Sequence, residues 1–272
     1  MTTTSKSAAL GVSRAANLPT RFYKDVTIKD EEGGAASLLL DGKPVRTPGK
    51  SHLIFPTRAL AEAAADEWRA QQERIDPSTM PLTKLANSAI DGVRGHEQTV
   101  IDDILKYAGS DLLCYRAEGP KALVASQTKH WDPVLCWAKA TLDAPLNLAE
   151  GVVHVAQPKA SLDGVRRALE GLDAFSLAAM HVMTTLTGSA LLPTAVLRGR
   201  LTPEQAWQAA HVDEDFQISQ WGEDAEAAHR RAHRRRDFNA AARVLETLAP
   251  EIQRLLPDLV TISVQGPSGT SD

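Results

Sequence analysis

Two histidines stand at the spacing that a metal site on a helix would use. His229 and His233 are four residues apart in a segment that we expect to be helical, so both rings would lie on one face. No glutamate follows His229 directly, as the helical zinc-protease pattern requires. Five arginines surround the pair: Arg230, Arg231, Arg234, Arg235 and Arg236. Because a divalent cation would add charge to a cluster that is already positive, we expect no metal ion there.

The same arginines could bind phosphate groups. The Arg230–Arg236 cluster has the charge density that a nucleic-acid backbone or another anionic surface would attract. No aromatic residue is interleaved with the arginines, so stacking on bases is not supported. The formal net charge of −4 favours a solvated helix face that nearby acids neutralise. Binding of nucleic acid or an anionic surface is therefore our alternative hypothesis, and we expect no nucleic-acid partner.

Cys114 is the residue that could act as a catalytic nucleophile, with His130 or His154 as its base. It lies in the segment DLLCYR, which is apolar next to the cysteine, and burial raises the pKa of a thiol and makes it unreactive. We expect a packed core cysteine. The sequence also has no GxGxxG, Walker or GxSxG motif. We therefore expect no catalytic residue, no cofactor and no small-molecule substrate, and we interpret the protein as not an enzyme.

A segment rich in acids and aromatic residues is the clearest sign of a binding surface. No lysine or arginine occurs between Arg200 and Arg230. Three aromatic residues lie in this stretch: Trp207, Phe216 and Trp221. Its acids are Glu204, Asp213, Glu214, Asp215, Glu223, Asp224 and Glu226. The pattern fits a protein contact in which aromatic rings supply affinity and charge supplies orientation. A solvated face with its rings packed inside the helices is the other interpretation.

The secondary-structure elements that would hold these residues fall into two groups, and the first group combines strands with helices. The segment 21–55 is rich in short apolar runs that are typical of strands, and Asp41-Gly42 between two of them predicts a hairpin. Thr57 is a predicted N-cap, because its hydroxyl can accept a free backbone N–H. The helix that follows has near-helical apolar spacing, which predicts that Trp68 packs against the sheet.

After residue 95 the strand signals nearly vanish and helical periodicity takes over. The run 175–186 is almost entirely apolar and predicts a central buried helix. Thr202-Pro203 predicts a helix start, with a capping hydroxyl and a first-turn proline. The predicted fold class is α+β. We expect a flexible leader at 1–20, a mixed domain with a small antiparallel sheet at 21–95, an all-α helical domain at 96–258 and a polar tail at 259–272.

Composition and charge are those of a globular protein in a reducing compartment. Of 272 residues, 43% are hydrophobic and 24% charged, which is ordinary for a globular domain. No run approaches the roughly 20 apolar residues that span a bilayer, so we expect no membrane insertion. The only two cysteines argue against a disulfide framework. Residues 1–24 contain four basic residues and no acid, which fits either a mitochondrial transit peptide or a bacterial leader.

Several segments, taken in order and spacing, resemble one protein family. They are RFYKDV at 21–26, LLLDGKPVRTP at 38–48, LIFPTRALAEAAADEWRAQ at 53–71, IDPSTMPLTKLANSAIDGV at 75–93, SDLLCYRAEGP at 110–120, WDPVLCWA at 131–138 and DEDFQISQWGEDAEAAH at 213–229. Together they are similar to the assembly chaperones that bind the free alpha subunit of the F-type ATP synthase catalytic head, found in mitochondria and alphaproteobacteria. The similarity extends from Arg21 to about Leu248.

The resemblance implies a two-part fold, mixed and then helical, and a function without catalysis. A free alpha subunit exposes an apolar surface that otherwise faces the beta subunit, and such a surface is an aggregation hazard. The implied chaperone covers this surface and hands the alpha subunit on for assembly, without ATP. The expected compartment is the bacterial cytoplasm, with the mitochondrial matrix as the alternative.

The resemblance also implies that an acidic residue near the WG motif at 221–222 is needed for activity. The matching acids here are Glu214, Glu223, Asp224 and Glu226, while three alanines (Ala225, Ala227 and Ala228) replace the acid and aromatic residue that the family pattern leads us to expect. We predict these partner-binding residues: Asp213, Glu214, Phe216, Trp221, Glu223, Asp224 and Glu226. For four residues in the first part, we expect a role in the fold rather than in partner contact: Trp68, Pro81, Thr83 and Asp91.

Overall fold

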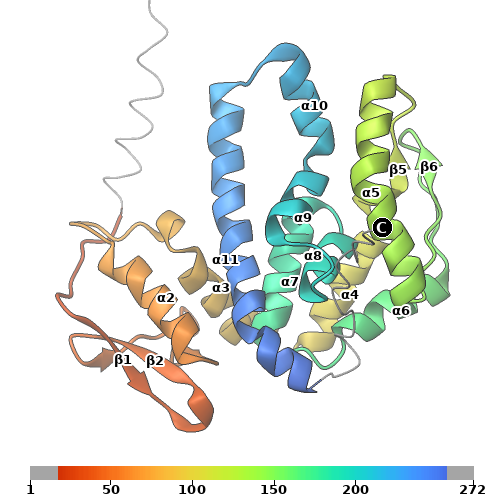
Figure 1. Cartoon of the computed structure of the whole chain (residues 1–272). Helices are drawn as coiled ribbons and strands as arrows, with labels where there is room; N and C mark the ends of the chain where they lie inside the picture. The colour runs from red at the N-terminus through yellow and green to blue at the C-terminus, as the bar shows by residue number, and fades with distance from the viewer. Residues whose placement is uncertain (1–17, 256–272) are drawn as a thin grey trace, which may run out of the picture. The chain divides into compact units, whose positions relative to one another are not determined.

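The computed structural model describes residues 18–255, which form two compact units (Figure 1). The first comprises residues 18–100, Asp173–Val182 and His229–Thr247, and the second comprises Ile101–Leu172, Met183–Ala228 and residues 248–255. Each unit thus combines segments that are far apart in the sequence. The predicted domains at 21–95 and 96–258 stay a prediction. The predicted tail at 259–272, and all but the end of the leader at 1–20, lie outside the described residues.

The first unit holds a small antiparallel sheet. Its strands are β1 (Val26–Asp30), β2 (Ala36–Leu40), β3 (Lys43–Pro44) and β4 (Ile54–Phe55), and the short 3-10 helix η1 (Glu32–Gly34) lies between the first two. Strand β2 is central, because β1 pairs along one edge and β3 and β4 share the other. The predicted hairpin at Asp41-Gly42 is confirmed. Both turn residues are left-handed, with φ of 47° and 76°, as a two-residue turn between twisted strands requires.

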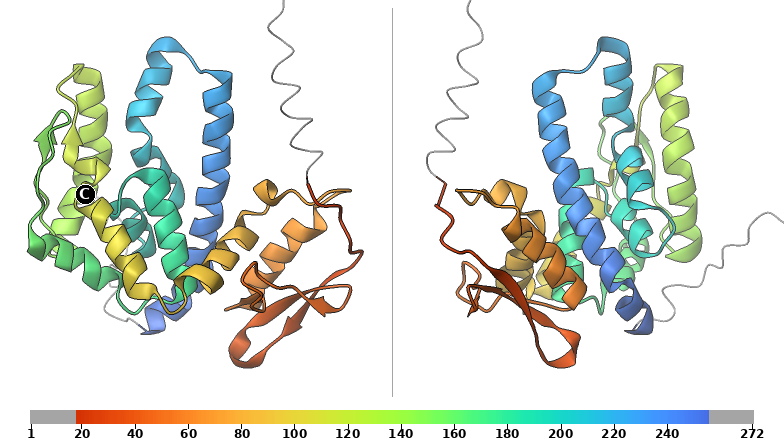
Figure 2. Two further views of the ribbon diagram at one scale, coloured as in Figure 1. Left: turned by 180° about the vertical axis from the view of Figure 1, so that it is seen from behind. Right: turned by 60° about the vertical axis from the view of Figure 1, so that its left-hand side comes forward.

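Helix α2 (Arg58–Arg69) lies over β1 and β2, and Figure 2 shows it across one face of the hairpin. The predicted cap is confirmed, since the Thr57 hydroxyl accepts a hydrogen bond from the backbone N–H of Leu60 at 3.3 Å. Three short elements follow: η2 (Pro77–Thr79), α3 (Pro81–Ser88) and the π-helical turn η3 (Ala89–Val93). The Glu67 carboxylate joins α2 to the start of α3, where it accepts from the backbone N–H groups of Leu82 and Thr83 and from the Thr83 hydroxyl.

The rest of the described chain is mostly helical. The helices are α4 (Glu97–Ala108), α5 (Lys121–Thr141), α6 (Lys159–Leu169), α7 (Ala174–Thr187), α8 (Leu191–Leu197), α9 (Pro203–Ala210), α10 (Val212–Trp221) and α11 (Ala225–Leu255). Helix α7 is the predicted apolar helix. Helix α9 begins with a full capping box, in which Thr202 and Gln205 each bond the other's backbone N–H, so the predicted start is confirmed. Together the sheet and the helices confirm the α+β class.

The second unit also contains a strand pair that the sequence did not predict. Strands β5 (Tyr115–Arg116) and β6 (Ala149–Glu150) form a two-residue parallel ladder. Just before β5, the 3-10 helix η4 (Leu112–Cys114) is held by a fully buried carboxylate. Asp111 accepts hydrogen bonds from the backbone N–H groups of Leu113, Ala190 and Leu191. Burial raises the pKa of Asp111 to about 6. This side chain therefore ties the end of α4 to the start of α8.

Candidate partner-binding surface

The turn between α10 and α11 is one exposed part of the acidic segment, and Glu204 and Asp215 are exposed elsewhere in it. Helix α10 ends at Trp221, because Gly222 adopts a left-handed φ of 83°. The Asp224 carboxylate then accepts from the backbone N–H of Ala227 at 2.8 Å, which makes Asp224 the cap of α11. Its negative charge also faces the positive end of the helix dipole. The turn is therefore a defined structure rather than an irregular link.

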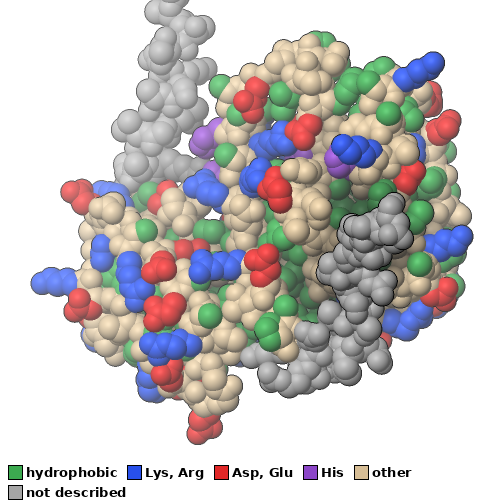
Figure 3. Space-filling view, viewed as in Figure 1, with side chains coloured by type: hydrophobic (Ala, Val, Ile, Leu, Met, Phe, Trp, Pro, Cys, Tyr) green, Lys and Arg blue, Asp and Glu red, His purple; other side chains and the backbone are tan. Residues whose placement is uncertain are grey.

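Four of the seven predicted residues lie together on this turn and are exposed: Trp221, Glu223, Asp224 and Glu226. We call them the WEDE turn. The Trp221 side chain is 80% exposed, which is unusual for the largest apolar residue type. Figure 3 shows hydrophobic side chains among charged ones at the end of the molecule where α10 joins α11. An exposed ring between acids is the arrangement that the protein-contact interpretation requires.

The other three predicted residues support α10 instead of lying free on its surface. Asp213 accepts a hydrogen bond from the Nε2 of Gln127, a buried residue of α5, at 2.8 Å. Glu214 lies 3.8 Å from the Nε2 of His211 in an i,i+3 pair. Phe216 is half-buried. The structure thus does not bring these three to the WEDE turn.

The residues of the acidic segment therefore lie in different surroundings, and for the exposed ones the protein-contact interpretation stays a prediction. Trp207 is 2% exposed and stacks on the ring of His211, with 3.9 Å between centroids. It belongs to the core, as the solvated-face interpretation expects. Trp221, only 14 positions later, lies in solvent. The sequence alone could not show which of the two tryptophans is buried, because burial depends on where α10 ends and on which helices cover α9.

A polar pocket of about 440 Å³, which was not predicted from the sequence, lies beside α10. Residues of α5, α9 and α10 line it: Ser126, His130, Gln208, Val212, Asp215, Phe216 and Ser219. The Nδ1 of His130 is 2.9 Å from the carbonyl oxygen of Ser126, which orients the ring along its own helix. The lining comes from segments that are about 80 residues apart, so only tertiary packing assembles the pocket. Phe216, a residue of α10, forms part of its wall.

The residues considered for metal binding and nucleophilic catalysis lie elsewhere. His229 and His233 are both on α11, with ring centroids 5.9 Å apart, and within residues 18–255 no three potential ligands gather into a metal-binding group. Cys114 is buried, and burial followed by the nearby Asp111 charge raises the pKa of its thiol to about 12. The prediction of a core cysteine is confirmed. In the same described range, no helix is both long and apolar enough to cross a bilayer.

The residues expected to maintain the first unit do make internal contacts. The Asp91 carboxylate accepts from the Thr47 hydroxyl and from the backbone N–H of Gly49, both at 2.7 Å. Thr83 bonds Glu67, and the backbone carbonyl of Trp68 accepts from the Tyr23 hydroxyl at 2.7 Å. These contacts agree with a role in the fold.

Comparison with known proteins gives one consistent result. Residues 20–139 match the family model described as ATP12 chaperone protein. The structure is similar to that of the Atu1473 protein of Agrobacterium tumefaciens, with a TM-score of 0.80 and 52% identity over 85% of this chain and 87% of that one. It is also similar to Atp12 from Paracoccus denitrificans, with a TM-score of 0.76 and 44% identity over 84% of this chain and 97% of that one.

A more distant relative extends the same pattern to a eukaryote. The mitochondrial protein atp12 of Schizosaccharomyces pombe is 24% identical over 219 residues, which is 75% of each chain. The two bacterial structures exceed 40% identity over most of their length. The chain belongs to the family of ATP12 chaperone proteins.

Proposed function

We propose that this protein is an ATP-independent chaperone of ATP synthase assembly that binds the free alpha subunit of the catalytic head. It keeps the alpha subunit from aggregating and hands it on to the beta subunit. Family membership supports the chaperone role, and the sequence resemblance supports the alpha subunit as the client. In this proposal the protein is not an enzyme and uses no cofactor. It acts in the bacterial cytoplasm; the mitochondrial matrix is the alternative, since the relatives include a mitochondrial protein and a bacterial one.

The single observation that carries the proposed contact is the exposed Trp221 ring on the WEDE turn. Two other tryptophans of the second unit, Trp131 and Trp207, are at most 2% exposed, which shows that the fold readily buries this residue type. In the isolated protein, the exposed Trp221 side chain forgoes a burial free energy of roughly 2 kcal/mol. A partner that covers the ring recovers this free energy, and the acids beside it would select a partner surface with basic residues.

The test is to weaken the turn without unfolding it. Trp221→Ala and Glu223→Lys alter exposed side chains, so both variants should fold normally. We expect each to weaken the complex with the alpha subunit about 10-fold or more, because truncation of a central aromatic anchor costs about 2 kcal/mol or more. Asp224 is left unchanged because it caps α11. Affinity is measured by titrating refolding alpha subunit with each variant and reading the soluble fraction.

Glu170→Lys is the matched control, because Glu170 is an exposed acid of the same unit outside the turn. It applies the same change in net charge. Affinity equal to that of the unchanged protein in both turn variants, with native circular dichroism, would refute the assignment of the contact to the WEDE turn.

A further inference from the structure

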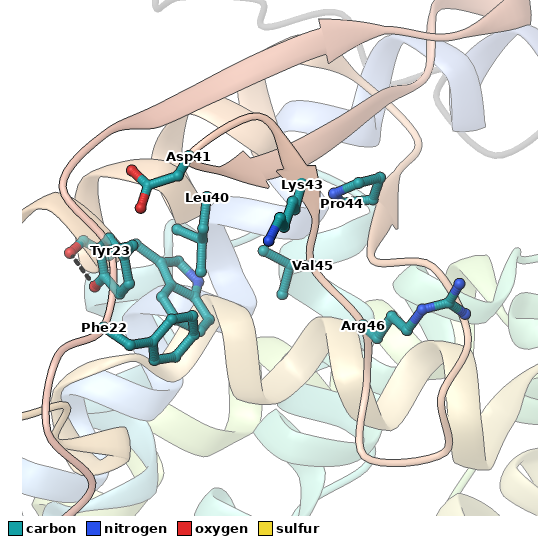
Figure 4. A pocket seen from close by; sticks show the side chains of 9 residues that line it. Phe22, Tyr23, Leu40, Asp41, Lys43, Pro44, Val45 and Arg46 are labelled. Atoms are coloured by element: carbon teal, nitrogen blue, oxygen red, sulfur yellow. Dashed lines mark hydrogen bonds between the residues drawn. The ribbon is translucent and has the colours of Figure 1, made fainter.

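The first unit contains an open pocket that the proposed function has not used. Its volume is about 460 Å³. Three parts of the chain line it. They are Phe22 and Tyr23 just before β1, residues of the β2–β3 hairpin and its continuation between Leu40 and Arg46, and Trp68 of α2. Figure 4 shows Phe22 and Tyr23 on one side, the Lys43–Arg46 segment on the other and Leu40 between them. The floor is apolar, because Leu40 and Tyr23 are buried.

The exposed ring at the pocket's edge is held there by its neighbours. Phe22 is 73% exposed. Arg21 donates to the backbone carbonyl of Gln71 at 2.6 Å, and the Tyr23 hydroxyl donates to the carbonyl of Trp68. The Phe22 ring contacts the Tyr23 ring edge-on, with 5.4 Å between their centroids, so the anchored Tyr23 side chain supports Phe22 at the edge of the pocket. The ring therefore stays exposed in the folded state, as a preorganised contact would.

The charges at the pocket favour an acidic ligand. The carboxylate of Asp41 is occupied within the fold, since the backbone N–H groups of Lys24 and Asp25 donate to it at 3.0 and 2.8 Å and lower its pKa. Lys43 and Arg46 are exposed, and no carboxylate among the described residues forms a salt bridge with either. The lining thus presents two cations that form no ion pair with the described residues, although Lys43 also interacts electrostatically with the Asp41 carboxylate.

A buried donor in the pocket wall is also unsatisfied. The indole Nε1 of Trp68 is inaccessible to water and has no hydrogen-bond acceptor among the described residues. A buried N–H without an acceptor costs about 1–3 kcal/mol, and such groups are rare unless a further component satisfies them. This N–H lies behind the pocket lining, so its resonance can report on occupancy of the pocket.

We infer that this pocket is a second contact for the client, and that it binds an apolar side chain flanked by a carboxylate. The apolar side chain would pack on Phe22, Leu40 and Val45, and the carboxylate would face Lys43 and Arg46. The chain's own N-terminal segment does not fit, because residues 1–17 carry Lys6 and Arg14 and no acid. The inference rests on the proposed function only in taking the alpha subunit as the protein that supplies this segment.

The first arm of the test locates the contact on the full chain. Phe22 is replaced by the photoreactive p-benzoylphenylalanine, the alpha subunit is co-expressed, and the complex is irradiated. We expect an adduct with an alpha-subunit peptide in which an apolar residue is next to Asp or Glu. The same photoreactive residue at Glu32, an exposed position of the same unit outside the pocket, should give no adduct.

The second arm tests the charges with a matched pair of double variants. Lys43→Glu with Arg46→Glu should weaken the complex about 10-fold or more. Lys29→Glu with Lys50→Glu makes the same change in net charge at exposed positions of the same unit and should change the affinity less than twofold. Equal loss in the two double variants, an adduct between two copies of this chain, or no adduct from a complex that still forms would each overturn the inference.

A third arm separates this inference from the proposed function. If the alpha subunit fails to bind at all, the proposed function fails, and a short peptide then tests the pocket directly. We expect acetyl-Leu-Phe-Asp-Glu-amide to shift the indole N–H resonance of Trp68, and acetyl-Leu-Phe-Lys-Lys-amide to leave it unchanged. Equal shifts, or none, from the two peptides would contradict the acidic specificity.

Discussion

Asp111 shows how one side chain can hold together segments that are 80 residues apart. It is fully buried, yet its carboxylate accepts hydrogen bonds from three backbone N–H groups of η4 and the α7–α8 junction. The hydrogen bonds stabilise the ionised form, but burial outweighs them and the pKa rises to about 6. The segment DLLCYR thus carries a structural carboxylate beside the buried Cys114 and no reactive group.

The raised pKa of Asp111 predicts a pH dependence of stability. A carboxyl that binds its proton more tightly when folded contributes stability that is complete below its unfolded pKa of 3.8 and is lost as pH rises to about 6. We therefore expect the free energy of unfolding of the unchanged protein, relative to that of Asp111→Asn, to fall between pH 4 and pH 6. Urea unfolding of both proteins at pH 4.5, 6 and 7.5 measures this difference. A constant difference across that range would contradict the assignment.

Asp224 links the proposed contact to the geometry of α11. Its side chain satisfies a free N–H at the start of the helix, while the side chain of Glu223 beside it makes no hydrogen bond or ion pair with any of the described residues 18–255. Acidic residues that are neighbours in sequence therefore differ in role. One positions the turn, and the other is available to a partner.

Replacing Asp224 should separate the cap from the charge. We expect Asp224→Ala to lower the free energy of unfolding by about 1 kcal/mol, because a backbone N–H of α11 loses its acceptor. Asp224→Asn should lower it by much less, since an amide oxygen caps nearly as well. Urea unfolding followed by circular dichroism compares the two. Equal losses in both variants would show that charge, and not capping, is what Asp224 contributes to stability.

Gly164 in α6 marks a close approach between helix and loop. A Cβ at this position would collide with the backbone carbonyl oxygen of Leu142 and lie 3.3 Å from that of Asp143. Alanine usually stabilises a helix relative to glycine by about 1 kcal/mol. Here the neighbouring atom belongs to the backbone and cannot move aside. We therefore expect the steric clash to outweigh the gain in helix propensity.

We accordingly expect Gly164→Ala to destabilise the protein by about 1–3 kcal/mol, the usual penalty of overpacking. Gly92→Ala is the matched control, because its added Cβ would have no atom within 4 Å. It should be neutral or slightly stabilising. Thermal unfolding of the two variants decides the matter, and a Gly164→Ala protein at least as stable as the unchanged one would show that α6 shifts to make room.

The local features of this fold were predictable, because each depends on a few neighbouring residues. The Asp41-Gly42 hairpin, the Thr57 cap and the Thr202 capping box all follow from the side chains at those positions. The α+β class followed from the change of periodicity near residue 95. What could not be predicted depends on packing between distant segments. The β5–β6 ladder, with two residues per strand, is too short to leave a pattern.

The same distinction divides the candidate site. The acidic segment was found from composition alone, but its division into support and exposed turn was not. Asp213 turns inward only because a buried amide, Gln127 of α5, lies opposite it, 86 positions earlier in the sequence. Trp221 is exposed as the last residue of α10, just before Gly222. A sequence pattern names the residues of such a surface, and the tertiary fold decides which of them a partner can reach.

At the scale of the molecule, the two proposed contacts share one design. Both proposed contacts present a large aromatic side chain that the fold leaves in water, namely Trp221 and Phe22. Acidic residues accompany Trp221 and basic residues accompany Phe22. A client would therefore have to match apolar surface with opposite charges at the two contacts. This requirement suits a chaperone that must recognise one subunit and then release it to its permanent partner.

Solubility of the alpha subunit is the most direct readout of the proposed chaperone function. The alpha subunit is expressed alone, with this protein, and with this protein followed by addition of the beta subunit, and each lysate is separated on a sizing column. We expect insoluble alpha subunit in the first case, a soluble complex with this protein in the second, and its replacement by an alpha–beta complex in the third. Alpha subunit that stays insoluble with this protein present, with no co-elution, would contradict the proposed function.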